Sequence, residues 1–160
     1  MKISANGLSI EVDDQGPPGA PAVLLIMGLG MQLVAWPDEL VQLLVTRGYR
    51  VIRFDNRDIG LSQHFDHLGV PNLAWAGMRY ALHLKLNPPY ALRDMAADAV
   101  GVLDALGIRS AHVCGASMGG MIAQHLAADF PDRVRTATLV MTTAGARSLP
   151  QPGMAVRQAM

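Results

Sequence analysis

The sequence is short of cysteine, of unbalanced charge and of long apolar runs, and each shortage excludes a class of protein. Its single cysteine, Cys114, rules out a disulfide within the chain and is typical of a reducing compartment. Lysine plus arginine number 13 and aspartate plus glutamate also number 13, so the formal net charge is zero. Because nucleic-acid surfaces need clustered basic residues and the sequence has no such run, we expect no nucleic-acid partner.

Signal-peptide and membrane-span patterns are also lacking. The N-terminal stretch MKISANGLSIEV has no apolar core of the kind that a signal peptide requires. The longest mainly apolar run, AVLLIMGLGM at 22–31, is interrupted by glycines and is far shorter than the ~20 residues of a spanning helix. We therefore expect a cytoplasmic protein without a membrane partner.

The composition is that of one globular domain: 160 residues, 51% hydrophobic and 16% charged. Strand-like and helix-like segments alternate, which indicates a mostly parallel sheet with helices on both faces. The Asn6-Gly7 turn between two short strands adds an N-terminal antiparallel hairpin. Strands are expected at 2–5, 8–14, 22–27, 49–54, 110–115 and 134–142, and helices at 37–47, 73–86, 92–106 and 118–130.

The stretch CGASMGG lies between a predicted strand and a predicted helix. It contains the pattern GxSxG centred on Ser117, and this context is typical of a nucleophile elbow. Such a turn holds the serine in a strained backbone conformation, so its neighbours must be small, as Gly115, Gly119 and Gly120 are. The alternative is a glycine-rich turn that connects the two elements without chemistry.

Two segments could supply donors to a developing oxyanion. The predicted helix begins directly after Ser117, so the backbone N–H of Met118 points toward the serine. The stretch MGLG at 27–30 follows a buried strand, where enzymes with this elbow place their second oxyanion donor.

Together GASMGG, MGLG and FDNRDIGLS (54–62) resemble the α/β-hydrolase superfamily, and within it the esterase-like group that includes the anthracycline methylesterases. The resemblance covers residues 1–143 and implies a three-layer α/β sandwich. It implies Ser117 as nucleophile and the backbone N–H groups of Leu29 and Met118 as the oxyanion hole. The family often has His-Gly where this chain has Met27-Gly28, a departure that leaves the backbone donor in place.

The charged residues of FDNRDIGLS invite a catalytic interpretation, but the resemblance implies a structural loop. In that interpretation Asp55 and Arg57 form hydrogen bonds that hold the turn. We expect Asp58 to be a solvated turn residue.

A general base is missing from the sequence. Only His125 follows Ser117, eight residues later on the same predicted helix and thus about two turns away from the elbow. We expect His112 to be a packed core residue. The remaining histidines precede the elbow, in the wrong chain order for this fold, and no set has the spacing of a metal site. They are His64, His67 and His83.

A catalytic acid is missing as well. Asp129 and Asp132 end the helix after the elbow and are expected to be solvated, and the strand at 134–142 carries no carboxylate. The resemblance implies that the family's sheet continues with further strands that carry both groups. We therefore interpret 1–143 as the N-terminal part of an α/β-hydrolase core whose last two strands are missing, and 144–160 as the start of a lid or a tail.

The sequence thus predicts a parent protein that hydrolyses a small-molecule carboxylic ester through an acyl-enzyme at Ser117, without a cofactor or metal. The same machinery could serve amide or carbon–carbon hydrolysis or perhydrolysis. A different alternative is a non-catalytic binding module or an inactive fragment.

Two further expectations concern surfaces. The last predicted strand would be an apolar edge, which favours self-association or pairing with a missing C-terminal half. Met31, Met118, Met121 and Trp36 form either an apolar pocket near the serine or part of the core.

Overall fold

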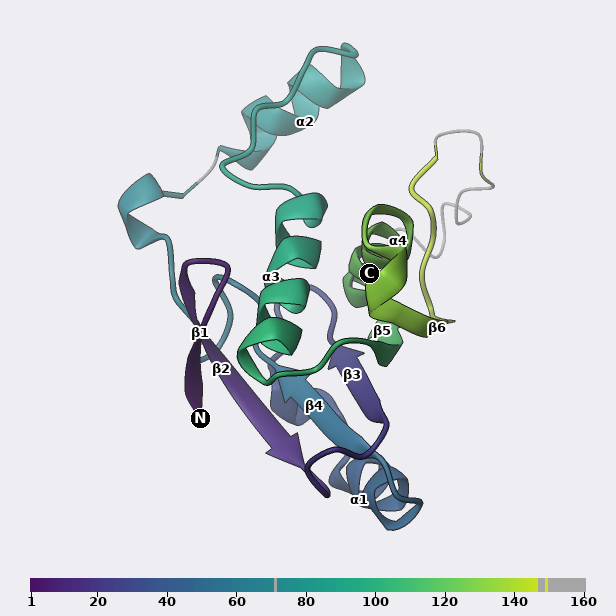
Figure 1. Ribbon diagram of the computed structural model, residues 1–160. Helices are drawn as coiled ribbons and strands as arrows, with labels where there is room; N and C mark the ends of the chain where they lie inside the picture. The colour runs from purple at the N-terminus through teal and green to yellow at the C-terminus, as the bar shows by residue number, and fades with distance from the viewer. Residues whose placement is uncertain (71, 147–148, 150–160) are drawn as a thin grey trace.

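Six strands form one mixed sheet, and helices cover both of its faces (Figure 1). The computed structural model describes residues 1–70, 72–146 and 149. The strands are β1 (Lys2–Ala5), β2 (Leu8–Gln15), β3 (Ala22–Ile26), β4 (Arg50–Phe54), β5 (Ala111–Ala116) and β6 (Val134–Val140). The helices are α1 (Asp38–Thr46), α2 (Leu73–Ala81), α3 (Leu92–Ala105) and α4 (Met118–Asp129). Three short 3₁₀ turns are η1 (Leu33–Ala35), η2 (Asp66–Leu68) and η3 (Pro131–Arg133).

The strand order is β1-β2-β4-β3-β5-β6. Strand β2 is antiparallel to both β1 and β4, whereas β4, β3, β5 and β6 are parallel to one another. Asn6 and Gly7 form the hairpin turn between β1 and β2, and both have positive φ. The expected α/β class, with a mostly parallel sheet and an N-terminal antiparallel hairpin, is confirmed.

The central strand β3 is buried on both faces and divides the core in two. Leu24 and Ile26 pack with α3 and α4, while Val23 and Leu25 pack on the opposite face, where α1 contributes Val41. Alternate side chains of a strand point to opposite faces, so one apolar run serves both layers. This burial fixes β3 in the middle of the sheet, and its carboxyl end therefore lies between those of β4 and β5.

The helix expected at 73–86 is shorter than predicted, because α2 ends at Ala81. His83 then adopts a left-handed conformation with φ 58°, which the helical pattern could not signal. At its start, the Asn72 side chain accepts a hydrogen bond from the Trp75 N–H at 2.9 Å. Figure 1 shows α2 projecting beyond the end of α3, away from the sheet.

Strand β6 is the outer strand of the sheet in the described part of the chain. Its last two residues, Leu139 and Val140, are 45% and 36% exposed. Of the segment expected to begin a lid or tail, only 144–146 and 149 are described, so that expectation lies mostly outside the described residues.

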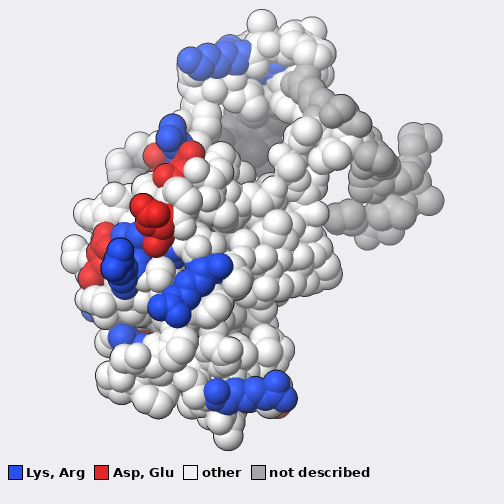
Figure 2. Space-filling view, turned by 45° about the vertical axis from the view of Figure 1, so that its right-hand side comes forward, with Lys and Arg blue, Asp and Glu red and all other residues white. Residues whose placement is uncertain are grey.

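On the face shown in Figure 2, charged side chains of both signs lie together at the left, and separate basic side chains lie at the top and at the bottom. The area to the right of the mixed group is uncharged. Among the described residues, no helix combines the length and apolar character that a bilayer crossing requires.

Candidate active site

Ser117 occupies the junction between β5 and α4 in a conformation that L-residues rarely adopt, with φ 54° and ψ −119°. Its backbone is fixed on both sides, since its N–H donates to the Val140 carbonyl at 2.9 Å and its own carbonyl accepts from Thr142 Oγ1 at 2.7 Å. The residue is exposed, and within the described chain no group hydrogen-bonds to its hydroxyl. The turn therefore presents a free hydroxyl at the carboxyl end of a parallel strand.

The glycines around the serine are required by close backbone approaches. A Cβ at Gly115 would lie 2.2 Å from the Gly119 carbonyl oxygen, and one at Gly119 would lie 2.1 Å from the Ile26 carbonyl oxygen. A Cβ at Gly120 would lie 2.6 Å from Thr142 Cβ. Any side chain at the first two positions would collide with main chain that cannot move aside, so the elbow can form only with glycine there.

The loop after β3 lies against the serine. An ideal Cβ built on Gly28 would be 3.1 Å from Ser117 Cβ and 3.6 Å from Ser117 Oγ. The next residue, Leu29, turns its side chain to solvent with 76% exposure, and its N–H makes no hydrogen bond among the described residues. As the first residue of α4, Met118 has no intrahelical acceptor for its N–H. Unused amides thus occur on both segments that meet at Ser117.

Asp55 and Asn56, directly after β4, bind this loop. Asp55 Oδ1 accepts from the Leu33 N–H at 2.7 Å and Oδ2 from the Leu61 N–H at 2.9 Å, while Asn56 Nδ2 donates to the Met27 carbonyl at 3.0 Å. No sequence pattern singles out Asn56, whose only signal is its position inside FDNRDIGLS.

The structural-loop interpretation implied that Arg57 holds its own turn, but the Arg57 side chain donates its hydrogen bonds to helix α3. Its Nε lies 2.6 Å from Asp98 Oδ2 on α3, and both side chains are almost fully buried. Burial alone lowers the pKa of Arg57, but the hydrogen bonds and charge of Asp98 outweigh it and raise that pKa. Arg57 therefore ties the loop after β4 to helix α3.

The expectation that Asp58 is a solvated turn residue is wrong. Its carboxylate accepts from the Phe65 N–H at 2.6 Å and from the Tyr90 hydroxyl. Burial, followed by the hydrogen bond to Asp58, raises the pKa of Tyr90 to about 12. The Phe65 and Tyr90 rings also pack against each other, with 5.8 Å between centroids. This contact joins the chain before α2 to the chain after it.

No base approaches the serine among the described residues. His125 lies two turns along α4, its side chain is 45% exposed, and its Nδ1 is 3.6 Å from Asp129 Oδ2. Asp129 in turn pairs with Arg93 at 3.1 Å, and the residue is exposed, as expected. These contacts hold α4 against the start of α3 and do not face Ser117.

The expectation that His112 is a core residue is also wrong. It is partly exposed, bonds Thr136 Oγ1 at 2.8 Å and meets the Tyr49 ring edge-on. On the face of the sheet that carries His112, α1 is the only helix in the described chain, and it packs against β4. The surface of β5 on this face is therefore partly uncovered.

The four residues proposed as a pocket or core are scattered. Trp36 is buried on the α1 face, Met118 packs on the opposite face, and Met31 is exposed on the loop after β3. Met121 lines a separate surface hollow beside Thr143. A different hollow of about 450 Å³ opens next to Met118 and has a mostly apolar lining. Within the described residues, no group of three His, Cys, Asp or Glu side chains is placed to hold a metal ion.

The chain is similar to known proteins in both sequence and fold. Residues 21–160 match the family model described as alpha/beta hydrolase fold. The chain is 40% identical over 126 residues to the rhodomycin D methylesterase DnrP of Streptomyces peucetius, covering 79% of this chain but 36% of that enzyme. This similarity confirms the resemblance to methylesterases that the motifs indicated.

Solved structures give the same result for the fold. A hydrolase from Pseudomonas aeruginosa PA01 superimposes with a TM-score of 0.71 at 27% identity, over 99% of this chain and 49% of that one. The enol-lactonase from Burkholderia xenovorans LB400 superimposes with a TM-score of 0.69 at 27% identity, over 90% of this chain and 47% of that one. The chain spans less than half the length of each of these relatives.

Proposed function

Because the chain belongs to the alpha/beta hydrolase fold family, we propose that it carries the nucleophile and oxyanion donors of a serine hydrolase that acts on small carboxylic esters. The observation that carries this proposal is the placement of Ser117: strained backbone, free hydroxyl, and the Gly28 loop in contact with it. The printed activities of its relatives, a methylesterase and an enol-lactonase, support the choice of ester chemistry.

The reaction follows from these positions. Ser117 Oγ attacks the ester carbonyl carbon and loses its proton to a base. The carbonyl oxygen becomes an oxyanion, which accepts hydrogen bonds from the backbone N–H groups of Leu29 and Met118. Collapse of this intermediate expels the alcohol, which takes up that proton, and leaves an acyl-enzyme. Water then attacks the acyl group and releases the acid, which regenerates the serine. The apolar hollow beside Met118 offers room for a nonpolar part of the substrate.

The base and the acid that orients it belong, in this proposal, to a part of the protein outside residues 1–160. In this fold the triad follows the chain order Ser, Asp/Glu, His. His125 does not fit that order, because the acid should come between the serine and the histidine in the chain. Its partner Asp129 instead follows it by one turn on the same helix. Loss of the histidine in a serine protease costs about 10⁶ in kcat, so residues 1–160 alone should have negligible turnover.

The missing base also favours a second candidate, a module that binds ligands or a partner without catalysis. Amide, carbon–carbon or peroxide chemistry at the same serine remains an alternative for the parent enzyme, because the fold alone does not determine the reaction.

The test is hydrolysis of p-nitrophenyl acetate by the full-length gene product that contains residues 1–160. Ser117→Ala should abolish turnover, whereas Ser110→Ala, at a partly exposed serine that accepts a hydrogen bond from Arg135, should not. A non-catalytic module would show equal background rates for all three proteins. Turnover that survives Ser117→Ala would refute the proposed nucleophile.

A further inference from the structure

The loop that contacts Ser117, residues 27–33, is a short arch that has few hydrogen bonds of its own. Residues 29–32 are all exposed, while Met27 and Leu33 at the two ends are buried. Within the arch the only hydrogen bond among the described residues joins the Met31 N–H to the Gly28 carbonyl, at 3.3 Å. A turn of this kind needs anchors if one of its amides is to keep a fixed position.

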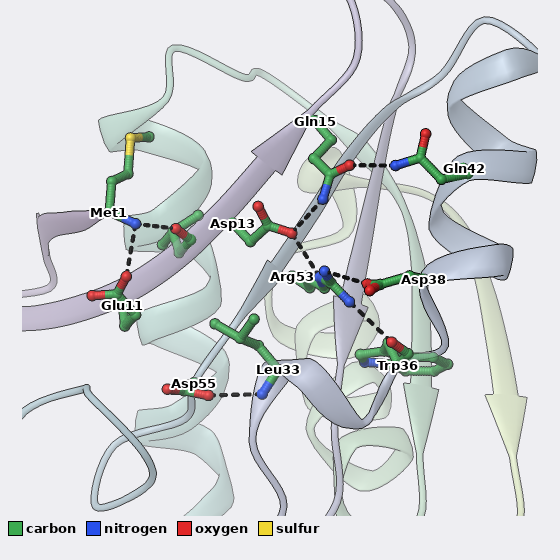
Figure 3. Close-up of polar contacts among 11 residues, drawn as sticks. Met1, Glu11, Asp13, Gln15, Leu33, Trp36, Asp38, Gln42, Arg53 and Asp55 are labelled. Atoms are coloured by element: carbon green, nitrogen blue, oxygen red, sulfur yellow. Dashed lines mark hydrogen bonds and ion pairs between the residues drawn. The ribbon is translucent and has the colours of Figure 1, made fainter.

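Two consecutive residues of the neighbouring strand end supply an anchor at each end of the arch. Asn56 Nδ2 donates to the carbonyl of Met27, where the arch begins, and Asp55 Oδ1 accepts from the N–H of Leu33, where it ends. Figure 3 shows the Asp55 carboxylate directed at the Leu33 nitrogen. Both side chains are only 2% exposed, so water does not compete for these bonds.

The anchors are themselves held in place. Asp55 accepts from the Leu61 N–H through its second oxygen, and its backbone carbonyl accepts from Ser62 Oγ at 2.6 Å. Asn56 Oδ1 is buried without a hydrogen-bond partner among the described residues. Burial of an unsatisfied amide oxygen costs stability. The evident role of the buried Asn56 side chain is therefore its hydrogen bond to the Met27 carbonyl.

We propose that Asp55 and Asn56 are positioning residues that fix the arch so that the Leu29 N–H faces the oxyanion formed at Ser117. This inference rests on the proposed function, because it concerns the same site. An oxyanion donor acts only if it is already in place when charge develops, and a displacement of about 1 Å can cost about 10²-fold in rate. The two residues act through the backbone and touch no reacting atom.

The experiment uses the full-length gene product and compares Asn56→Ala and Asp55→Asn with Asp14→Asn. Asp14 is an apt control because its carboxylate is mostly buried and pairs with Arg50 at the start of β4, and among the described residues its side chain bonds neither the anchors nor the arch. For p-nitrophenyl acetate, the two test variants should lose about 10- to 100-fold in kcat with KM within about twofold. A phenylboronic acid, which forms a tetrahedral adduct on the serine, should lose affinity by a similar factor.

Asp14→Asn should keep kcat although its melting temperature falls. Equal kcat losses in Asn56→Ala and Asp14→Asn would overturn the inference, since they would indicate a general structural effect.

A second readout does not depend on activity. Amide hydrogen exchange of the full-length protein, followed in peptides that cover residues 27–33, should be faster in Asn56→Ala than in wild type and unchanged in Asp14→Asn. If Ser117→Ala retains esterase activity, the proposed function fails, and the exchange data alone decide whether Asp55 and Asn56 fix the arch. Unchanged exchange in Asn56→Ala would overturn the inference whatever the activity shows.

Discussion

Gly28 and Ser117 are in contact across two strands that are far apart in the sequence: a Cβ on Gly28 would lie 3.1 Å from the serine Cβ. Strands β3 and β5 are hydrogen-bonded neighbours, so the segments that follow them emerge side by side. The approach leaves too little space for a side chain at position 28 unless the arch or the serine shifts.

Gly28→Ala should therefore lower the reactivity of Ser117 without unfolding the protein. The added methyl group would sit closer than an ordinary contact to Ser117 and push the arch or the serine aside by a few tenths of an ångström. We expect reaction of the full-length protein with a fluorophosphonate to slow about tenfold or more. Gly77→Ala is the matched control, because a Cβ there meets nothing within 4 Å and alanine favours a helix; an equal slowing in both variants would contradict this account.

The buried ion pair between Arg57 and Asp98 should be the most sensitive polar contact in the fold. Asp98→Asn leaves the Arg57 guanidinium buried without a counter-charge, and we expect a loss of about 3 kcal/mol in the free energy of unfolding, measured with urea. Asp104→Asn on the same helix is the control. Its carboxylate is 63% exposed where it pairs with Arg133, so the loss should be below about 1 kcal/mol. Similar losses in the two variants would show that Asp98 is not a special partner.

Tyr90 should make stability depend on alkaline pH. Its pKa is raised to about 12, above the ordinary value of 10.0, so the folded state retains a proton that the unfolded state loses. The stabilisation is present in full below pH 10 and is lost as the pH rises toward 12. Urea unfolding of wild type and Tyr90→Phe across this range should show a steeper decline for wild type. Parallel declines would contradict the raised pKa.

The outer strand β6 should promote association of residues 1–160. Within the described residues its outer edge has no partner strand and exposes backbone N–H and carbonyl groups, and Leu139 adds apolar surface. Light scattering should show dimers or larger species, and Leu139→Lys should shift them toward monomer. The corresponding change at Leu43, which is 51% exposed on α1, should have no such effect. A monomer at high concentration would refute the prediction.

Local patterns were sufficient to predict most of the fold. The strands and helices have apolar repeats that match their burial, and the glycines at 115 and 119 marked the elbow because only glycine tolerates such close backbone contacts. A Cβ at Gly120 would likewise lie close to the Thr142 side chain. The alternation of strands and helices then implied the parallel sheet that brings the ends of β3 and β5 together.

The polar contacts were harder to predict, because their partners are distant in sequence. Arg57 pairs with a residue 41 positions away and Asp58 with one 32 positions away, and no local pattern signals either partner. His112 lies within a strand next to the elbow, but its exposure depends on which helices cover that face of the sheet, and no local pattern signals this. The bond from Asn56 to the arch likewise depends on two strands lying side by side.

The central claim is that Ser117 is the nucleophile of an ester hydrolase. The most direct measurement is peptide mapping by mass spectrometry after the full-length protein has reacted with a fluorophosphonate and lost its esterase activity. The account predicts one adduct, on the peptide that contains Ser117, formed in proportion to the lost activity and absent from Ser117→Ala. Inactivation with the adduct on another residue, while the Ser117 peptide stays unmodified, would contradict it.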